Sequence, residues 1–233
     1  SSKSPTKCVL ASGATVSIAD VNVGDIVSAR AGDMIVTDGV ITTGKGNDTI
    51  VSLAGDDTIE AGDGVNTITA TDGENDIDGG EGVDTITAGD GNNTIDGGDG
   101  ADVIVAGKGN NTITNAAGNA TITAGNGNNN VTNTAGNSTI TLGNGTNVVN
   151  LTAGNSTVIT GDGADDINIT AGNNDITAGA GNDSISLGSG NDTVDAGTGT
   201  DAVDFSVARG TWTGAITGAE TVTATYTGSA TID

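Results

Sequence analysis

One pattern of hydrophobic and polar positions recurs every nine residues from Thr43 to Asp204. The first units are TGKGNDTIV, SLAGDDTIE and AGDGVNTIT, and the last is AGTGTDAVD. The fourth position is Gly and the eighth is Ile or Val in all 18 units, without an insertion. A period held in phase over this length indicates a repeat architecture in which each unit is one structural element.

Within each unit, positions seven to nine are predicted to form a three-residue strand and the rest a turn. Alternation along the strand sends position eight inward and positions seven and nine outward. Glycines at positions two and four allow positive φ angles in a tight turn. Two units make one coil with a strand on each side, so the fold class is all-β, a parallel β-roll (β-solenoid) of about nine coils. At roughly 4.8 Å per coil, the rod is expected to be about 43 Å long.

The two ends of the chain leave this register. Residues 1–42 alternate apolar and polar residues and are predicted to form an N-terminal β cap on the solenoid of residues 43–204. Residues 205–233 hold all three aromatic residues and are predicted to form a C-terminal β cap or an assembly segment, because a solenoid end is an unpaired edge.

Composition and charge narrow the possible partners. The net charge is −24 with only six Lys and Arg residues, which argues against nucleic acid and favours a bound cation. No apolar run is long enough for a transmembrane segment. The chain lacks His, which excludes an HExxH zinc site and a Ser-His-Asp triad, and its glycines follow the period of nine rather than a phosphate-binding motif. We therefore expect no enzymatic activity.

The units GGEGVDTIT (residues 79–87) and GGDGADVIV (residues 97–105) resemble the RTX repeat, GGxGxDxUx, at every position. The resemblance covers residues 43–204. It implies a calcium-binding β-roll in a secreted protein of the class that includes toxins, proteases, lipases, adhesins and S-layer proteins. It also implies export by type I secretion, folding in extracellular calcium, and Ca²⁺ as the cofactor.

Calcium prefers six to eight oxygen ligands, which turn carbonyls and the carboxylate at position six can supply. Because an ion between turns one coil apart joins residues 18 apart, position six is read along each side of the roll separately. Three neighbouring pairs then carry two carboxylates: Asp84 with Asp102, Asp165 with Asp183, and Asp183 with Asp201. Pairs with one carboxylate are weaker candidates: Asp48 with Asn66, Asp57 with Asn75, and Asn174 with Asp192. The alternative for any single Asp is a turn residue that bonds its own backbone.

The middle of the chain departs from the family pattern, because no Asp or Glu occurs from Val103 through Gly161. From the eighth to the thirteenth unit, position six is Asn, Ala, Asn, Ser, Asn and Ser. We expect stacked amides at Asn111, Asn129 and Asn147 to hold these coils without calcium. The middle is thus predicted to be metal-independent and flanked by calcium-dependent portions.

The predicted function is that of an extracellular structural protein of a bacterial cell surface. Calcium would stabilise its roll, and copies would self-assemble in a surface layer, filament or adhesin stalk. A homo-oligomer is expected, and a cell-surface polysaccharide is a further candidate partner. One alternative is an ice-binding solenoid that uses a flat Thr/Val face, and another is the calcium-binding secretion module of a longer RTX enzyme or toxin.

Overall fold

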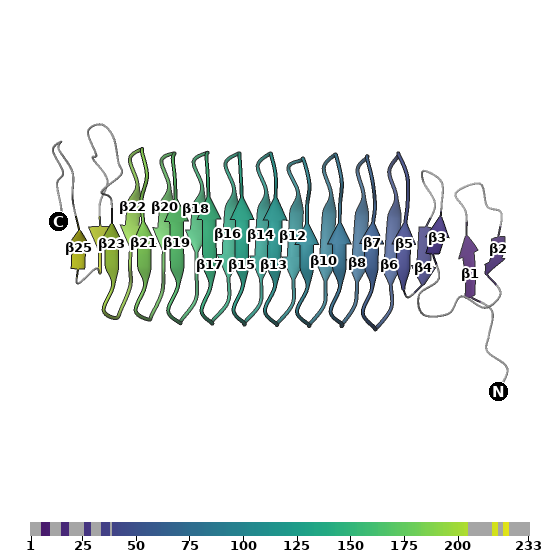
Figure 1. Cartoon of the computed structure of the whole chain (residues 1–233), viewed down its shortest axis with the longest axis horizontal. Coiled ribbons are helices and arrows are strands. Elements are labelled where there is room, and N and C mark those ends of the chain that lie inside the picture. Colours follow the sequence, from purple (N-terminus) through teal and green to yellow (C-terminus); the bar gives the residue numbers. More distant parts are fainter. Residues whose placement is uncertain are drawn as a thin grey trace.

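The computed structural model describes residues 39–204 and the backbone of further strands at both ends, at residues 6–9, 15–18, 26–28, 34–37, 216–218 and 221–223. These residues form strands, turns and bends, with no helix among them. The part of the chain described here accordingly contains no helical segment with the length and apolar character of a membrane span. The fold is a parallel β-solenoid of about nine coils, seen as a long stack in Figure 1.

Two sheets run along the stack, with one strand of each coil in either sheet. The first sheet contains, in spatial order, β2 (Thr15–Ile18), β1 (Thr6–Val9), β4 (Met34–Thr37), β6 (Thr49–Ser52), β8 (Thr67–Ala70), β10 (Thr85–Ala88), β12 (Val103–Ala106), β14 (Thr121–Ala124), β16 (Thr139–Leu142), β18 (Thr157–Ile159), β20 (Asp175–Thr177), β22 (Thr193–Asp195) and β24 (Ile216–Thr217). The second contains β25 (Thr221–Thr223), β23 (Ala202–Asp204), β21 (Ser184–Ser186), β19 (Asp166–Ile169), β17 (Val148–Leu151), β15 (Asn130–Asn133), β13 (Thr112–Asn115), β11 (Thr94–Asp96), β9 (Asp76–Asp78), β7 (Thr58–Glu60), β5 (Val40–Thr42) and β3 (Ile26–Ser28).

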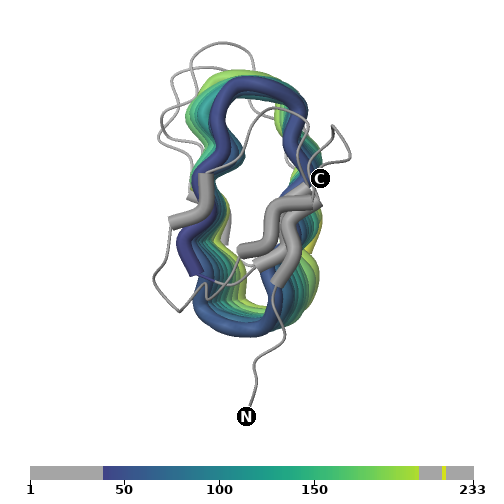
Figure 2. Tube along the Cα trace, turned by 90° about the vertical axis from the view of Figure 1, so that its right-hand side faces the viewer, coloured from purple at the N-terminus to yellow at the C-terminus, as the bar shows by residue number. Residues whose placement is uncertain are grey.

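The 18-residue register predicted from the sequence is confirmed by the strand pairing. Ile86 pairs with Ile68 on one side and with Ile104 on the other. The view along the axis in Figure 2 shows the coils superimposed as a flattened ring with one sheet on each long side. Every Ile or Val at position eight points into this ring and is at most 1% exposed, from Ile50 to Val203. The core is therefore two facing rows of β-branched side chains, supplemented by position-one residues.

Parallel stacking begins before the first nine-residue unit. β4 pairs in parallel with β6, and β3 and β5 continue the second sheet in parallel with β7. Beyond β4, β1 pairs with β4 and with β2 in the antiparallel sense. At the other end, β24 and β25 add one parallel strand to each sheet. The predicted β caps stay predictions, and the aromatic residues of the C-terminal one lie outside the described residues.

The turns depend on glycine at position four. In 17 of the 18 units this glycine has a φ between 100° and 154°, a region that side chains with a Cβ rarely adopt. At position two, by contrast, the glycines with positive φ are only Gly62, Gly80, Gly98, Gly179 and Gly197. The turns therefore take two forms, and the predicted positive φ at position two is confirmed in five units. The coils also approach closely here: a Cβ on Gly127 would clash with the carbonyl oxygen of Gly109.

We expect Gly127→Ala to destabilise the roll by at least about 2 kcal/mol, because it combines a disfavoured φ of 141° with a backbone clash. The matched control is Gly44→Ala, where a Cβ would meet nothing within 4 Å and φ is not in the positive region. Urea unfolding followed by circular dichroism measures both variants. Equal unfolding midpoints would contradict the claim that position four fixes the turn.

Candidate metal centres in the turns

Position six of each unit stands directly before a strand, at the inner side of a turn. Along the stack these residues form two columns, one before the strands of the first sheet and one before those of the second. The first column contains Asp48, Asn66, Asp84, Asp102, Ala120, Ser138, Ser156, Asn174 and Asp192, and the second contains Asp57, Asn75, Asn93, Asn111, Asn129, Asn147, Asp165, Asp183 and Asp201. All eight carboxylates in these columns are at most 2% exposed.

In each of the two-carboxylate pairs, one carboxylate oxygen joins neighbouring coils. The Oδ1 atom of Asp102 accepts a hydrogen bond from the backbone N–H of Asp84 at 2.8 Å. The same bond runs from Asp165 to Asp183 at 2.8 Å and from Asp183 to Asp201 at 2.9 Å. The structure therefore brings together the members of all three two-carboxylate pairs.

The pairs with a single carboxylate use the same bond. The backbone N–H of Asp48 donates to Asn66 Oδ1 at 3.0 Å, and that of Asp57 to Asn75 Oδ1 at 3.2 Å. The backbone N–H of Asn174 donates to Asp192 Oδ1 at 2.9 Å. Position-six side chains thus cap backbone N–H groups across coils, rather than bonding only their own turn.

The second oxygen of these carboxylates distinguishes Asp from Asn. In six of them Oδ2 is buried without a hydrogen-bond partner: Asp84, Asp102, Asp165, Asp183, Asp192 and Asp201. Asn66 shows what this position can do when it holds a donor, because its Nδ2 donates to the carbonyl oxygens of Gly62 at 3.1 Å and Gly79 at 3.2 Å.

Asp84 stands one coil after Asn66 in the same column. Its Oδ2 atom is an acceptor at the place where Asn66 has the donor Nδ2. A Cβ placed on Gly79 would lie 3.0 Å from Asp84 Oδ2 and 2.9 Å from the Gly97 carbonyl oxygen, so these two acceptors face the same point. Two buried oxygens without a donor between them are costly, and a cation removes the cost.

The pKa values of these carboxylates also indicate that a cation would favour their ionised form. Burial, with the nearby Asp102 carboxylate adding to it, raises the pKa of Asp84 to about 6, against the opposing effect of the bond from the Asn66 backbone. Burial, with Asp165 and Asp201 adding to it, likewise raises the pKa of Asp183 to about 6. The pKa values of Asp102, Asp165 and Asp192 are also raised, mainly by burial. Without a cation, the ionised form of these groups is disfavoured in the fold.

The donor set suits calcium. No group of three or more His, Cys, Asp or Glu side chains converges within the described residues, so a site here would combine one or two carboxylates with backbone and amide oxygens. Calcium accepts such mixed oxygen sets with flexible geometry. The eight carboxylates fit the role predicted for them, and their assignment as ligands stays a prediction.

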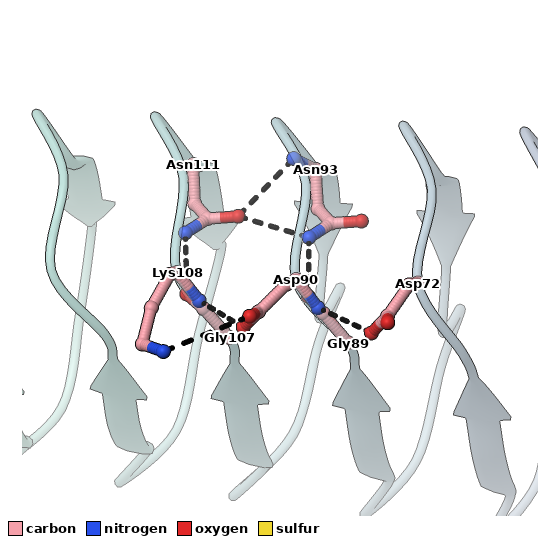
Figure 3. A network of polar contacts seen from close by, with 7 residues as sticks. All are labelled: Asp72, Gly89, Asp90, Asn93, Gly107, Lys108 and Asn111. Carbon is pink, nitrogen blue, oxygen red and sulfur yellow. Dashed lines mark hydrogen bonds and ion pairs between the residues drawn. The ribbon is translucent and has the colours of Figure 1, made fainter.

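In the second column the middle coils use amides instead. Nδ2 of Asn93 donates to Asn111 Oδ1 at 3.0 Å and also to the carbonyl oxygens of Gly89 and Gly91, as Figure 3 shows in part. The ladder continues through Asn129 to Asn147 at 2.9 and 3.0 Å. The predicted amide ladder is confirmed. It is longer than predicted, because it starts at Asn75 and ends on Asp165 Oδ1.

In the first column the middle coils use hydroxyl groups. The Ser138 and Ser156 hydroxyls each accept a backbone N–H from the coil before at 3.1 Å. Ala120 carries no oxygen, so the first column is interrupted there. Both columns thus cross the middle of the roll without a carboxylate, and its independence of calcium stays a prediction.

Further columns on the outside of the turns escaped the sequence analysis. At position three, Asp72 Oδ1 accepts the backbone N–H of Asp90, and Asp90 Oδ1 accepts that of Lys108 (Figure 3). At position five, Asn137 Oδ1 accepts the N–H of Asn155. These bonds run in the opposite direction to those of position six. The signal available in the sequence was the recurrence of Asn and Asp at these positions every 18 residues.

The two sheet faces differ in charge. The outward positions of the first sheet from β6 to β18 hold only Thr, Val and Ile. On the second sheet, Glu60, Asp78 and Asp96 are stacked by strand pairing and line a depression together with Asp76. Burial and the neighbouring Asp96 raise the pKa of Asp78.

We expect the calcium-free protein to become more stable as the pH falls from 7 to 5. Because the folded-state pKa of Asp84 and Asp183 is about 6, against about 4 in an unfolded chain, protonation favours the fold. This contribution is complete below about pH 4 and is lost as the pH rises through about 6. Thermal unfolding in metal-free buffers measures it, with saturating calcium as the comparison in which the gain should disappear. A lower melting temperature at pH 5 than at pH 7 without calcium would contradict it.

Comparison with known proteins adds one match. The family model of the RTX calcium-binding nonapeptide repeat matches four times, over residues 42–77, 78–113, 141–168 and 169–203. No curated protein and no solved structure matches the chain. The unmatched stretch between the second and third copies, residues 114–140, lies within the acid-free middle, although its strands keep the same register. Since the matches cover more than half of the chain, it belongs to the RTX calcium-binding nonapeptide repeat family.

Proposed function

We propose that this RTX β-roll is a non-enzymatic, extracellular structural element that calcium stabilises and that self-assembles through the face of its first sheet. RTX repeats bind Ca²⁺ and are typical of secreted bacterial proteins. The observation that carries the calcium part is the set of six buried Oδ2 atoms without hydrogen-bond partners. A bound calcium ion would supply the positive charge that balances these buried carboxylate oxygens.

Calcium acts as a folding switch in this proposal. In its absence, buried carboxylates and a net charge of −24 oppose compaction, so the acidic portions stay open. When calcium binds only the folded state, its binding free energy becomes folding free energy. The middle coils, joined by amide and hydroxyl bonds, connect the two switched portions.

Assembly is assigned to the first sheet because its face is flat and uncharged over many coils. Three of the large apolar side chains on it are about 40% exposed, Val103 at 39%, Val105 at 40% and Ile159 at 41%. The opposite face carries Glu60, Asp78 and Asp96, which would repel the same surface of another copy. The uncharged outward stretch of the first sheet runs from β6 to β18, whereas that of the second sheet runs only from β13 to β17, so the first sheet offers the longer surface for a face-to-face approach without like-charge repulsion. A surface layer, a filament or an adhesin stalk would each use such contacts.

Ordered Thr rows favour one further candidate, ice binding. Thr67, Thr85 and Thr121 share the position-seven row of the first sheet, with Val103 between the last two, and strand pairing sets their spacing. A regular Thr array on a rigid sheet would present hydroxyl and methyl groups in two dimensions. A thermal hysteresis measurement on the calcium-loaded protein tests this candidate directly, and freezing without hysteresis excludes it.

We expect Asp84→Asn to stabilise the calcium-free protein by about 1–3 kcal/mol, because its new amide can donate to the Gly97 carbonyl as Asn66 donates to Gly79. The same variant should bind less calcium and gain less stability from it. Asp76→Asn is the control, since it makes the same charge change on an exposed strand position. Urea unfolding with and without calcium reads out both effects. A less stable calcium-free variant, or unchanged calcium binding, would contradict the assignment.

For assembly, we expect the double variant Thr121→Lys and Thr139→Lys to weaken self-association at least about 10-fold, because two copies would bring like charges together across the contact. The control is Thr112→Lys with Asn130→Lys, which places the same charges at exposed position-seven sites of the second sheet in the same part of the roll. Sedimentation velocity and electron microscopy in calcium follow assembly. A monomeric wild type, or equal loss in both variants, would refute the proposed face.

A further inference from the structure

Asn115 is a core residue with an unexplained polar atom. It occupies position one of its unit, at the end of β13, and is 1% exposed. Its Nδ2 donates to the carbonyl oxygen of Ala117 at 3.0 Å, whereas its Oδ1 is buried without a hydrogen-bond partner. Apolar side chains fill the same position in later coils, for example Leu151 and Leu187. Packing alone therefore does not require an amide here.

The unpartnered oxygen points at a second one. A Cβ placed on Gly97 would lie 2.6 Å from Asn115 Oδ1 and 3.0 Å from Asp102 Oδ2, so both oxygens converge on the space that glycine leaves open. Asp102 is fully buried, and its Oδ1 already accepts the backbone N–H of Asp84. Two buried acceptors at one point call for an occupant that is either a cation or a double donor.

One coil earlier, around Gly79, a second oxygen also faces the carboxylate, but it comes from the backbone. Around Gly79, the oxygen that faces Asp84 Oδ2 is the backbone carbonyl of Gly97. Around Gly97, the Asn115 amide oxygen takes that place. Asn115 thus supplies from a side chain the oxygen that the preceding coil supplies from its backbone.

The end of the carboxylate column explains why such an oxygen is needed. After Asp84 and Asp102, the next residue in the first column is Ala120, which has no side-chain oxygen. An ion beyond Asp102 would find no ligand at position six of the following coil. Asn115 lies in that following coil and reaches back to Asp102.

We propose that Asp102 Oδ2 and Asn115 Oδ1 share a calcium ion, which makes Asn115 a ligand outside position six and extends calcium binding one coil into the acid-free middle. The inference rests on the proposed calcium sites. A carboxylate with a neutral amide and backbone carbonyls is an oxygen set that calcium accepts. A water molecule that donates to both oxygens is the other occupant, and the experiment separates the two.

Asn133 provides a matched control. It stands at position one of the next coil, is fully buried, donates from Nδ2 to Ala135, and also has an unpartnered Oδ1. The position-six residues around it are Ala120 and Ser138, so no carboxylate faces it. Leucine fits at both sites, since Leu151 fills the same position one coil further.

The experiment compares Asn115→Leu and Asn133→Leu by calcium titration calorimetry on the full chain. We expect Asn115→Leu to lose one calcium ion, or to weaken one site at least about 10-fold, while Asn133→Leu binds as the wild type does. Unchanged binding in both variants would overturn the proposal and leave water as the occupant. Equal losses in both would overturn it as well, since a packing effect would then explain them. A wild type that binds no calcium would refute the proposed function itself.

A third variant tests the site by gain of affinity. Asn115→Asp keeps the size of the side chain and adds a carboxylate opposite Asp102, so it should tighten calcium binding at this site and lower the melting temperature of the calcium-free protein. Tighter binding with a lower calcium-free melting temperature supports the shared ion. Weaker or unchanged calcium binding would count against it.

Discussion

One backbone N–H per half-coil, at position six, must find an acceptor across the gap between coils, and the rest of the roll is arranged around this requirement. The strand ladders cannot supply it, because the group lies in the turn just before the strand begins. A side-chain oxygen of the adjacent coil meets it at nearly every step, whether that oxygen belongs to Asp, Asn or Ser. A slip of one residue would remove this oxygen and also turn the inward Ile row outward. Turn chemistry and core packing thus enforce the same register.

Asp and Asn both supply this acceptor through Oδ1, and they differ only in the second polar atom of the side chain, which is Oδ2 in Asp and Nδ2 in Asn. The amide of Asn129 donates to the carbonyl oxygens of Gly125 and Gly127, so these acceptors are matched inside the protein. The carboxylate of Asp183 leaves an acceptor instead. The same position-six bond therefore occurs in turns that match their own donors and acceptors and in turns that are predicted to need a cation, and a single atom, nitrogen or oxygen, distinguishes the two. The unmatched stretch of the family model falls where nitrogen and hydroxyl groups prevail.

Much of this structure was predictable from the sequence because the period of nine constrains every residue at once. The 18 inward Ile and Val positions, the parallel pairing and the Asn111 to Asn147 ladder follow from spacing alone. The two turn forms could not be predicted from the spacing, because Gly80 and Gly89 are both glycine at position two and only Gly80 has positive φ. The approach of Asn115 Oδ1 to Asp102 Oδ2 could not be predicted either, because it depends on the orientation of a single amide. Periodic reasoning fails where one side chain departs from its column.

The amide ladder also bears on how the chain reaches its fold. In a stack where each coil contacts only its neighbours, folding can begin at any point and spread outward. The second-column turns from Asn93 to Asn147 close with their own hydrogen bonds, so these turns would not need to wait for an ion. Each proposed calcium site on either side would then form against a coil that is already folded. On the proposed function, the protein would carry its own folding nucleus at its centre, and calcium would govern elongation rather than initiation.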